Sequence, residues 1–256
     1  MTVAFEASDF ALLAAVIVGG ALQRIAGMGF AMVVAPFAVL LLSGQQGVVF
    51  ANLSGAFAAM ALIWPARADI DRKRLLILST TSIAGAAGGA LIVRFLDIGT
   101  FRILVGGILL CAILGSLLIA RSRLVVPLTP ASFAAGSATG LLVTMSGIGG
   151  PPMSIYAVLT RWEHRQFAAT MQPFVLFSSL IAAGAVLLSV PDSAPQLPPA
   201  NWLIIAGALV SGLAIGQLLH RRIPPTIGRI AVIVLGIIGA VTAIVSGVSI
   251  VVAGRG

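Results

Sequence analysis

The chain has 256 residues, of which 59% are hydrophobic and only 9% are charged, and its formal net charge is +8. A soluble domain carries about 25% charged residues, so this composition excludes a water-soluble enzyme or binding domain and predicts a polytopic all-α membrane protein. The basic residues lie in short loops and do not form a run with interleaved aromatic residues. They are expected to orient the chain in the lipid bilayer, and no nucleic-acid partner is expected.

Ten apolar runs follow one another along the chain, which is enough for about eight to ten membrane segments. They fall at residues 9–26, 30–43, 47–64, 75–96, 100–120, 129–146, 153–160, 166–190, 200–219 and 226–252. No connection between them is long enough for a soluble domain. The single cysteine, Cys111, lies within the fifth run, where it is expected to pack as a small core residue. Residues 1–9 carry no Lys or Arg, so a cleaved signal peptide is not indicated.

Glycine interrupts this apolar sequence at two equivalent places, residues 27–29 and 147–150. A membrane helix broken at matching places in two halves points to the binding site of a transporter. The reason is that helix ends at membrane depth leave N–H and C=O groups that lipid cannot bond. Two half-helices meeting there would direct their N-terminal N–H groups at an anion. Close helix packing, in which glycine only makes room, is the alternative interpretation.

The two halves of the chain are related in sequence. At an offset of 120, matched pairs include Gly20–Gly140, Gly27–Gly147, Gly29–Gly149, Asn52–Gln172 and Phe57–Phe177. At an offset of 127, matched pairs include Gly85–Gly212, Gly89–Gly216, Arg94–Arg221 and Arg102–Arg229. The pattern predicts two transmembrane repeats, residues 1–124 and 125–256, within one integral membrane domain.

The distribution of basic residues predicts the orientation of the repeats. Basic residues gather in four connections, at residues 67–74, 121–123, 161–165 and 221–222. The positive-inside rule puts all four in the cytoplasm, and loops 43–47 and 191–201, which lack Lys and Arg, outside together with both termini. Residues 129–160 must then enter and return as a hairpin, re-entrant or fully crossing, and residues 9–43 do the same from the other face. The repeats are therefore expected to be inverted, whereas a single broken crossing at 129–160 would make them parallel.

The candidate substrate site combines the glycine breaks with nearby polar residues. Its candidate residues are Gln23, Arg24, Gly27, Gly29, Asn52, Ser146, Gly147, Gly149, Gly150 and Gln172. Hydroxyl and carboxamide groups can donate to an oxyanion, or they can bond the helix backbone or tie two helices together. Arg24 is either a substrate ligand or one more orienting charge at the cytoplasmic surface. No Cys/His cluster or ATP-binding loop motif occurs, so neither a metal nor a cofactor is expected.

With these motifs the chain resembles the sulfite exporter TauE/SafE family over essentially its whole length. The resemblance rests on Gly20, Gln23, Gly27-Met28-Gly29 and Pro36, and on Ser146-Gly147-Ile148-Gly149-Gly150-Pro151. The glycine and arginine pattern of residues 85–102 and 212–229 supports it. The resemblance implies that the protein moves small anions, typically sulfite or organosulfonates, across the bacterial inner membrane.

The sequence therefore predicts a secondary transporter of a small anion, not an enzyme, in which one repeat rocks against the other about a site near mid-membrane. No acidic residue lies plainly inside an apolar run, which argues against a carboxylate proton relay and leaves uniport, exchange or proton–anion symport. The alternatives are an anion channel, a non-transporting scaffold and an intramembrane serine protease that uses Ser146. Against the protease, Thr144 stands where a Gly-x-Ser-Gly motif requires glycine. The anion, the direction of transport and the oligomeric state, a homo-oligomer included, stay open.

Overall fold

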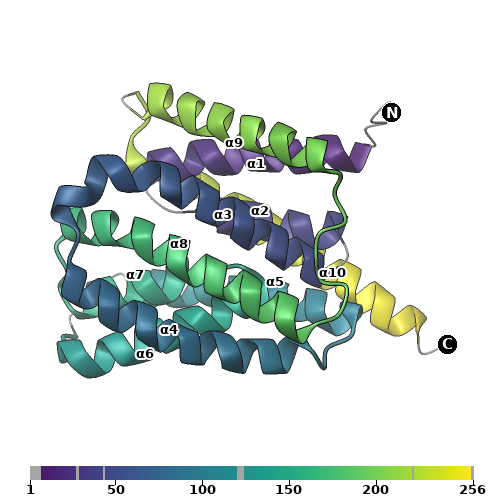
Figure 1. The fold of residues 1–256 in the computed structure, drawn as a ribbon, viewed down its shortest axis with the longest axis horizontal. Coiled ribbons are helices and arrows are strands. Elements are labelled where there is room, and N and C mark those ends of the chain that lie inside the picture. Colours follow the sequence, from purple (N-terminus) through teal and green to yellow (C-terminus); the bar gives the residue numbers. More distant parts are fainter. Residues whose placement is uncertain (1–6, 27–28, 43, 120–123, 221, 255–256) are drawn as a thin grey trace.

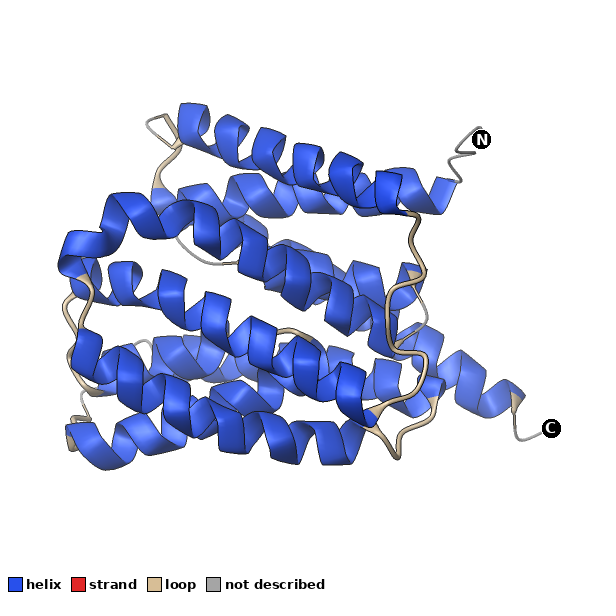
Figure 2. Ribbon diagram, in the orientation of Figure 1, coloured by secondary structure: helices blue, strands red, loops and turns tan. Residues whose placement is uncertain are grey.

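The computed structural model describes residues 7–26, 29–42, 44–119, 124–220 and 222–254. Within these residues the chain forms ten α-helices, one short 3₁₀ helix and no strand, which confirms the predicted all-α class. In chain order the elements are α1 Ala7–Ala26, α2 Phe30–Leu41, α3 Gln45–Ala66, η1 Arg67–Asp69, α4 Arg72–Val93, α5 Ile98–Ile119, α6 Leu128–Ser146, α7 Gly150–Leu159, α8 His164–Ser189, α9 Pro199–Leu219 and α10 Pro225–Ala253. Figures 1 and 2 show the helices running side by side in one bundle.

Helix length separates the spanning helices from the half-helices. Six helices, α3, α4, α5, α8, α9 and α10, are long and apolar enough to cross a membrane. By contrast, α2 and α7 have 12 and 10 residues. At about 1.5 Å per residue they extend only about 18 and 15 Å, too short for a hydrocarbon core of about 30 Å. These two half-helices are the ones that follow the glycine breaks.

The two ends of the bundle differ in charge. At one end, which we call the terminal end, α1 begins, α10 ends, and the α2–α3, α4–α5 and α8–α9 connections lie (Figure 1). At the opposite end, which we call the basic end, lie the α3–α4, α7–α8 and α9–α10 connections. The described basic residues in or beside these connections are Arg67, Arg72, Lys73, Arg74, Arg161, Arg165 and Arg222. Arg121, Arg123 and Arg221 lie outside the described residues.

Glycine brings neighbouring helices into contact through their backbones. A Cβ atom added to Gly85 of α4 would lie 1.9 Å from the carbonyl oxygen of Ser137 in α6. One added to Gly212 of α9 would lie 2.4 Å from the carbonyl oxygen of Ile17 in α1. Since no side chain fits in either contact, α4 packs directly on α6 and α9 directly on α1, as small residues allow in membrane helices.

The outer surface of the bundle is apolar, as a bilayer requires. Large hydrophobic side chains such as Trp64, Leu118 and Leu188 are exposed there. Cys111 is also exposed on α5, so the expectation that it packs in the core is wrong. The reason is that most residues of α5 are not buried inside the bundle, and an apolar run in a membrane helix does not distinguish a lipid-facing position from a core position.

Candidate functional site

The second glycine break turns the chain back along the helix that precedes it. Gly147 has a φ of +75°, and its N–H donates to the carbonyl oxygen of Val143 at 2.8 Å, which ends α6 in a left-handed cap. A Cβ added to Gly149 would lie 2.4 Å from Val143 Cγ2 and 2.8 Å from Thr139 Cγ2. Residues 147–149 therefore run back beside α6. As a result α7 begins level with Thr139, about 16 Å from the start of α6.

α7 then returns to the basic end and completes a hairpin with α6. The backbone N–H of Val126, just before α6, donates to the carbonyl oxygen of Leu159, the last residue of α7, at 3.0 Å. Nearby, the hydroxyl oxygens of Ser132 and Tyr156 lie 2.7 Å apart. Because the ends of α6 and α7 meet, the second break is a hairpin that leaves the first turn of α7 in the middle of the bundle.

The described residues on either side of the first break also form a hairpin, with a different hydrogen bond at the start of its second helix. Gly29 has a φ of +133°, a conformation that L side chains rarely adopt, and α2 begins directly after it. The side-chain oxygen Oε1 of Gln23 accepts the backbone N–H of Phe30, the first residue of α2, at 3.1 Å. A Cβ added to Gly19 would lie 2.8 Å from Val34, so α2 runs back beside α1. The N-terminus of α2 is therefore also held inside the bundle.

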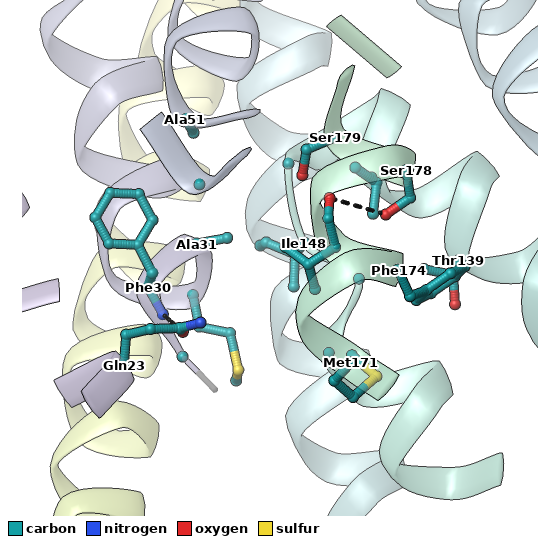
Figure 3. A pocket seen from close by; sticks show the side chains of 18 of the residues that line it. Gln23, Phe30, Ala31, Ala51, Thr139, Ile148, Met171, Phe174, Ser178 and Ser179 are labelled. Carbon is teal, nitrogen blue, oxygen red and sulfur yellow. Dashed lines mark hydrogen bonds between the residues drawn. The ribbon is translucent and has the colours of Figure 1, made fainter. Parts of the chain in front are cut away.

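Both breaks line a single cavity of about 60 Å³, which we call the central cavity. Residues 29–32 lie on one side, residues 147–150 on another, and parts of α3, α6 and α8 complete the wall. The polar side chains among the described lining residues are Gln23, Thr139, Gln172, Ser178 and Ser179. Figure 3 shows Gln23 and Phe30 on one side of this space and Ile148, Phe174 and Thr139 on the other. No charged side chain is among the described residues that line it.

The structure divides the sequence-predicted residues into two groups. Those that line the central cavity are Gln23, Gly29, Gly147, Gly149, Gly150 and Gln172. The others bond elsewhere. Asn52 donates through Nδ2 to the carbonyl oxygen of Val143 at 3.1 Å and so ties α3 to α6. Arg24 donates to Oε1 of Gln217 in α9. Ser146 donates to the carbonyl oxygen of Leu142 at 2.8 Å. Gly27 lies outside the described residues.

Three hydroxyl residues that line the cavity, Thr139, Ser178 and Ser179, were not predicted. Thr139 is 1% exposed, and its hydroxyl oxygen has no hydrogen-bond partner among the described residues. The sequence could have indicated Ser179 as a lining residue, because it follows Gln172 by seven residues and so lies on the same face of α8. Thr139 carries no such signal, since it reaches the cavity only because the chain doubles back beside α6.

A second cavity of about 600 Å³ adjoins the central cavity, and we call it the vestibule. It lies among α5, α7, α8 and α10 and shares Met32, Gly150 and Met171 with the central cavity. Its charged and titratable lining side chains are Arg161, His164 and Arg229, with no acidic residue among the described ones. Because Arg161 lies in the α7–α8 connection and His164 begins α8, the vestibule leads from the basic end of the bundle to the central cavity.

The opposite path, toward the terminal end, is filled by packed side chains. This cluster, which we call the terminal plug, consists of the buried residues Val39, Val48, Val93, Phe101, Val105 and Met145. They come from α2, α3, α4, α5 and α6. The structure is therefore open on the basic side of the central cavity and closed on the terminal side.

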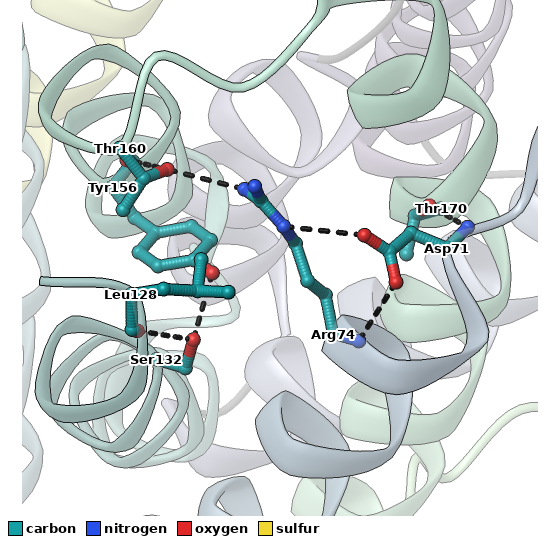
Figure 4. Close-up of polar contacts among 7 residues, drawn as sticks. All are labelled: Asp71, Arg74, Leu128, Ser132, Tyr156, Thr160 and Thr170. Carbon is teal, nitrogen blue, oxygen red and sulfur yellow. Dashed lines mark hydrogen bonds and ion pairs between the residues drawn. The ribbon is translucent and has the colours of Figure 1, made fainter.

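An arginine anchors the base of the second hairpin at the basic end (Figure 4). Arg74 of α4 pairs with Asp71 at 3.2 Å and donates through Nη1 to the hydroxyl of Thr160, also at 3.2 Å. Its guanidinium carbon also lies 4.5 Å from the ring centroid of Trp162. The end of α7 is thereby fixed to α4, one of the spanning helices.

Two broken helices enclosing a small, uncharged cavity, reached through a basic vestibule, are features of an anion site within a membrane protein. The family model for the sulfite exporter TauE/SafE matches residues 11–243. The chain belongs to the sulfite exporter TauE/SafE family. This confirms the resemblance inferred from the two glycine motifs, and the matched range includes both of them.

Membership in the TauE/SafE family identifies a multi-pass membrane transporter of sulfite or a related anion. The match extends from α1 to α10, so the whole helical bundle belongs to the family unit. Searches of curated proteins and of solved structures find no match to the chain.

Proposed function

We propose that the protein is a secondary transporter that binds a small oxyanion, sulfite or an organosulfonate, in the central cavity and exposes it alternately to the two sides of the bacterial inner membrane. The observation that carries this proposal is that both glycine breaks line the same small cavity. A site assembled from both broken helices can be opened from either side by moving one hairpin relative to the other.

The proposed anion ligands are backbone and side-chain donors without formal charge. The amides of Ala31 and Met32 lie in the first turn of α2 and that of Gly150 begins α7, where helix geometry leaves N–H groups without an intrahelical acceptor. All three residues line the cavity, as does Thr139 with its hydroxyl. Gln23 adds its carboxamide NH₂, since its oxygen already accepts from Phe30. The dipoles of both half-helices favour negative charge there.

The volume of the central cavity favours a small substrate. A single water needs about 10–15 Å³ by the same measure, so about 60 Å³ accommodates an anion of a few heavy atoms. An organosulfonate would place its charged head in the central cavity, and its organic part would extend past Met32 and Met171 into the vestibule.

The proposal includes two inverted repeats, residues 1–124 and 125–256. Two helix contacts support the repeats, because the sequence offsets convert the residues of one contact into the residues of the other. Gly85 packs on the carbonyl oxygen of Ser137, and Gly212, 127 positions after Gly85, packs on that of Ile17, 120 positions before Ser137. The hairpins also return to opposite ends of the bundle, α2 to the terminal end and α7 to the basic end. With the basic end in the cytoplasm, both termini lie outside.

A thermal-shift measurement on the purified protein tests the anion site. Sulfite, methanesulfonate, sulfate and acetate are compared, because an anion that binds only the folded state raises its stability, by about 2.7 kcal/mol at one hundred times the dissociation constant. We expect sulfite or methanesulfonate to raise the melting temperature. If none of the four does so, the oxyanion site is contradicted.

Two threonines of α6 provide a matched pair for the same measurement. Thr139→Val removes a cavity hydroxyl and should weaken anion binding about tenfold or more, because hydrogen bonds to charged groups contribute about 1.5–3 kcal/mol. Thr144→Val should leave binding unchanged, since that hydroxyl donates to the carbonyl oxygen of Gly140 at 2.8 Å and does not line the cavity. Equal losses in both variants would contradict the assignment of Thr139. In proteoliposomes, flux that saturates with substrate supports a transporter over a channel.

A further inference from the structure

An arginine at the terminal end holds the first half-helix against two spanning helices. Arg102 of α5 donates through Nη1 to the hydroxyl of Ser246 in α10 at 2.6 Å. Through Nη2 it donates to the carbonyl oxygen of Leu40, near the C-terminal end of α2, at 3.1 Å. No carboxylate among the described residues pairs with it. One guanidinium thus joins α2, α5 and α10 beside the terminal plug.

The repeat offsets identify the three equivalent positions at the basic end. Arg102 corresponds to Arg229 at an offset of 127, and Leu40 corresponds to Thr160 at an offset of 120. Ser246 corresponds to Ile119, 127 positions earlier. These positions lie on α10, at the end of α7 and at the end of α5. At both ends of the bundle the three positions therefore belong to α5, to α10 and to the half-helix of one hairpin.

At the basic end, however, these positions surround open space. Arg229 and Ile119 both line the vestibule, as do Val158 and Arg161 on either side of Thr160. Arg229 is exposed, and it has no hydrogen bond or ion pair with the described residues. The arginine that is bonded at the closed side of the central cavity therefore has an unbonded counterpart at the open side.

We propose that Arg102 and Arg229 are alternating latches on the two half-helices. When the vestibule closes, Arg229 donates to the carbonyl oxygens at the C-terminal end of α7, as Arg102 now does to Leu40 on α2. When the terminal side opens, Arg102 releases α2. The last carbonyls of α7 carry the negative end of its dipole, and an oxygen that already accepts one N–H group, as Leu159 does from Val126, keeps a second lone pair, so these oxygens are suitable acceptors for a guanidinium. The latches rest on the proposed alternating access.

Cysteine accessibility in the purified protein tests the latches directly. Cys111 is the only cysteine and is exposed, so Cys111→Ala is the parent. Val48→Cys reports opening of the terminal plug, in which Val48 is fully buried, and Ile155→Cys reports the vestibule. The rate of reaction with a charged, water-soluble thiol reagent is measured at each reporter.

Removing the bonded latch should shift accessibility in opposite directions at the two reporters. We expect Arg102→Gln to speed labelling of Val48→Cys at least about fivefold and to slow labelling of Ile155→Cys, whereas general destabilisation would speed both. Arg102→Lys should restore part of the parent pattern. Arg94→Gln is the matched control, because Arg94 lies at the same end, its guanidinium carbon is 5.1 Å from the ring centroid of Phe95, and its side chain has no hydrogen bond or ion pair with the described residues.

The unbonded latch should behave in the complementary way. We expect Arg229→Gln to leave Val48→Cys protected and to slow anion exchange in proteoliposomes, while anion binding is retained. If Arg102→Gln does not fold, Ser246→Ala removes one of its hydrogen bonds and should give the same shift, smaller in size. Unchanged labelling in the Arg102 or Ser246 variants overturns the latches. The absence of any anion-induced thermal shift in the parent instead overturns the transport proposal, so the two failures are distinguishable.

Discussion

The two broken hairpins lie at equivalent places, yet they supply hydrogen-bond donors to the central cavity in different ways. At the first break the leading amide of α2, Phe30, is already bonded to Gln23, and the amides that follow it are available to a ligand. At the second break the first turn of α7 contains Pro151 and Pro152, which have no N–H group. There Gly150 is the only amide donor among these three residues, and Thr139, which also lines the cavity, adds a hydroxyl.

This difference teaches that the two halves of the chain share the broken hairpin, whereas the polar groups that each hairpin offers to the cavity differ. Glycine is needed at both breaks because the backbone reverses there, and Gly29 and Gly147 both have positive φ. The polar groups, in contrast, come largely from the second half. Ser178 and Ser179 line the cavity, and the residues 120 positions earlier are alanines. Nearly equivalent hairpins can therefore enclose a cavity whose polar lining is asymmetric.

The largest effect is expected at the first break. Gly29→Ala should destabilise the protein by at least about 2 kcal/mol, because φ of +133° strains any L residue and the new methyl would lie 2.7 Å from Val232 Cγ2. Gly55→Ala is the control, since it lines the same cavity and its methyl would meet only Phe30 at 3.7 Å. Thermal melting checks both variants. A Gly29→Ala protein as stable as Gly55→Ala would show that the first break does not need glycine.

The next effect concerns the cap that distinguishes the first break. Gln23→Leu leaves the buried amide of Phe30 without its acceptor, which should cost about 1–3 kcal/mol of stability in the absence of ligand. An anion could then accept from that amide, and this new donor would replace the lost NH₂ group of Gln23, so the anion-induced rise in melting temperature should stay close to that of the wild type. Gln46→Leu, at a glutamine bonded to the carbonyl oxygen of Asp192 in the exposed α8–α9 connection, should not show this loss of stability. A smaller anion shift in Gln23→Leu would mean that the side chain binds the anion more strongly than the amide does.

A gain of binding is expected at the second break. Pro151→Ala returns an N–H group to the first turn of α7, where it is directed along the helix axis toward the cavity. One additional hydrogen bond contributes about 0.5–1.5 kcal/mol, so affinity for sulfite should rise about twofold to tenfold in a titration. Pro199→Ala makes the same change at the start of α9, away from the cavity, and should leave affinity unaltered. Weaker binding in Pro151→Ala would indicate that rigid prolines matter more than donors.

The smallest expected change in stability is at the start of α5, a helix that does not follow a glycine break. Asp97 precedes α5, and hydrogen bonds from the hydroxyl and then the backbone N–H of Thr100 hold the pKa of its carboxyl below the usual value. A pKa lowered by folding contributes stability above the unfolded-state pKa, and this contribution is lost as the pH falls through the folded-state pKa. Asp97→Asn should therefore melt slightly below the wild type at pH 7 and equally with it in acid. A difference that persists in acid would contradict a role for the charge.

The sequence predicts the helices and the breaks well because both follow from local chemistry. Apolar runs must become helices in lipid, and glycine in the middle of such a run marks a place where the helix can stop. Side-chain direction is less predictable. Asn52 and Gln172 match in the two halves, yet Gln172 lines the cavity and Asn52 bonds the carbonyl oxygen of Val143. Which helix a carboxamide meets depends on tertiary packing, and no local signal encodes it.

The contacts between glycine and carbonyl oxygen also determine which parts of the protein can move as a unit. α4 belongs to the first half of the chain and α6 to the second, and the same holds for α1 and α9. Each pair touches main chain to main chain, so no rotamer change can absorb sliding between its members. Each of these contacts therefore joins a helix of the first half of the chain to a helix of the second half, α1 to α9 and α4 to α6. The proposed transport movement must therefore carry α1 together with α9 and α4 together with α6, so it cannot separate residues 1–124 from residues 125–256 as two rigid units.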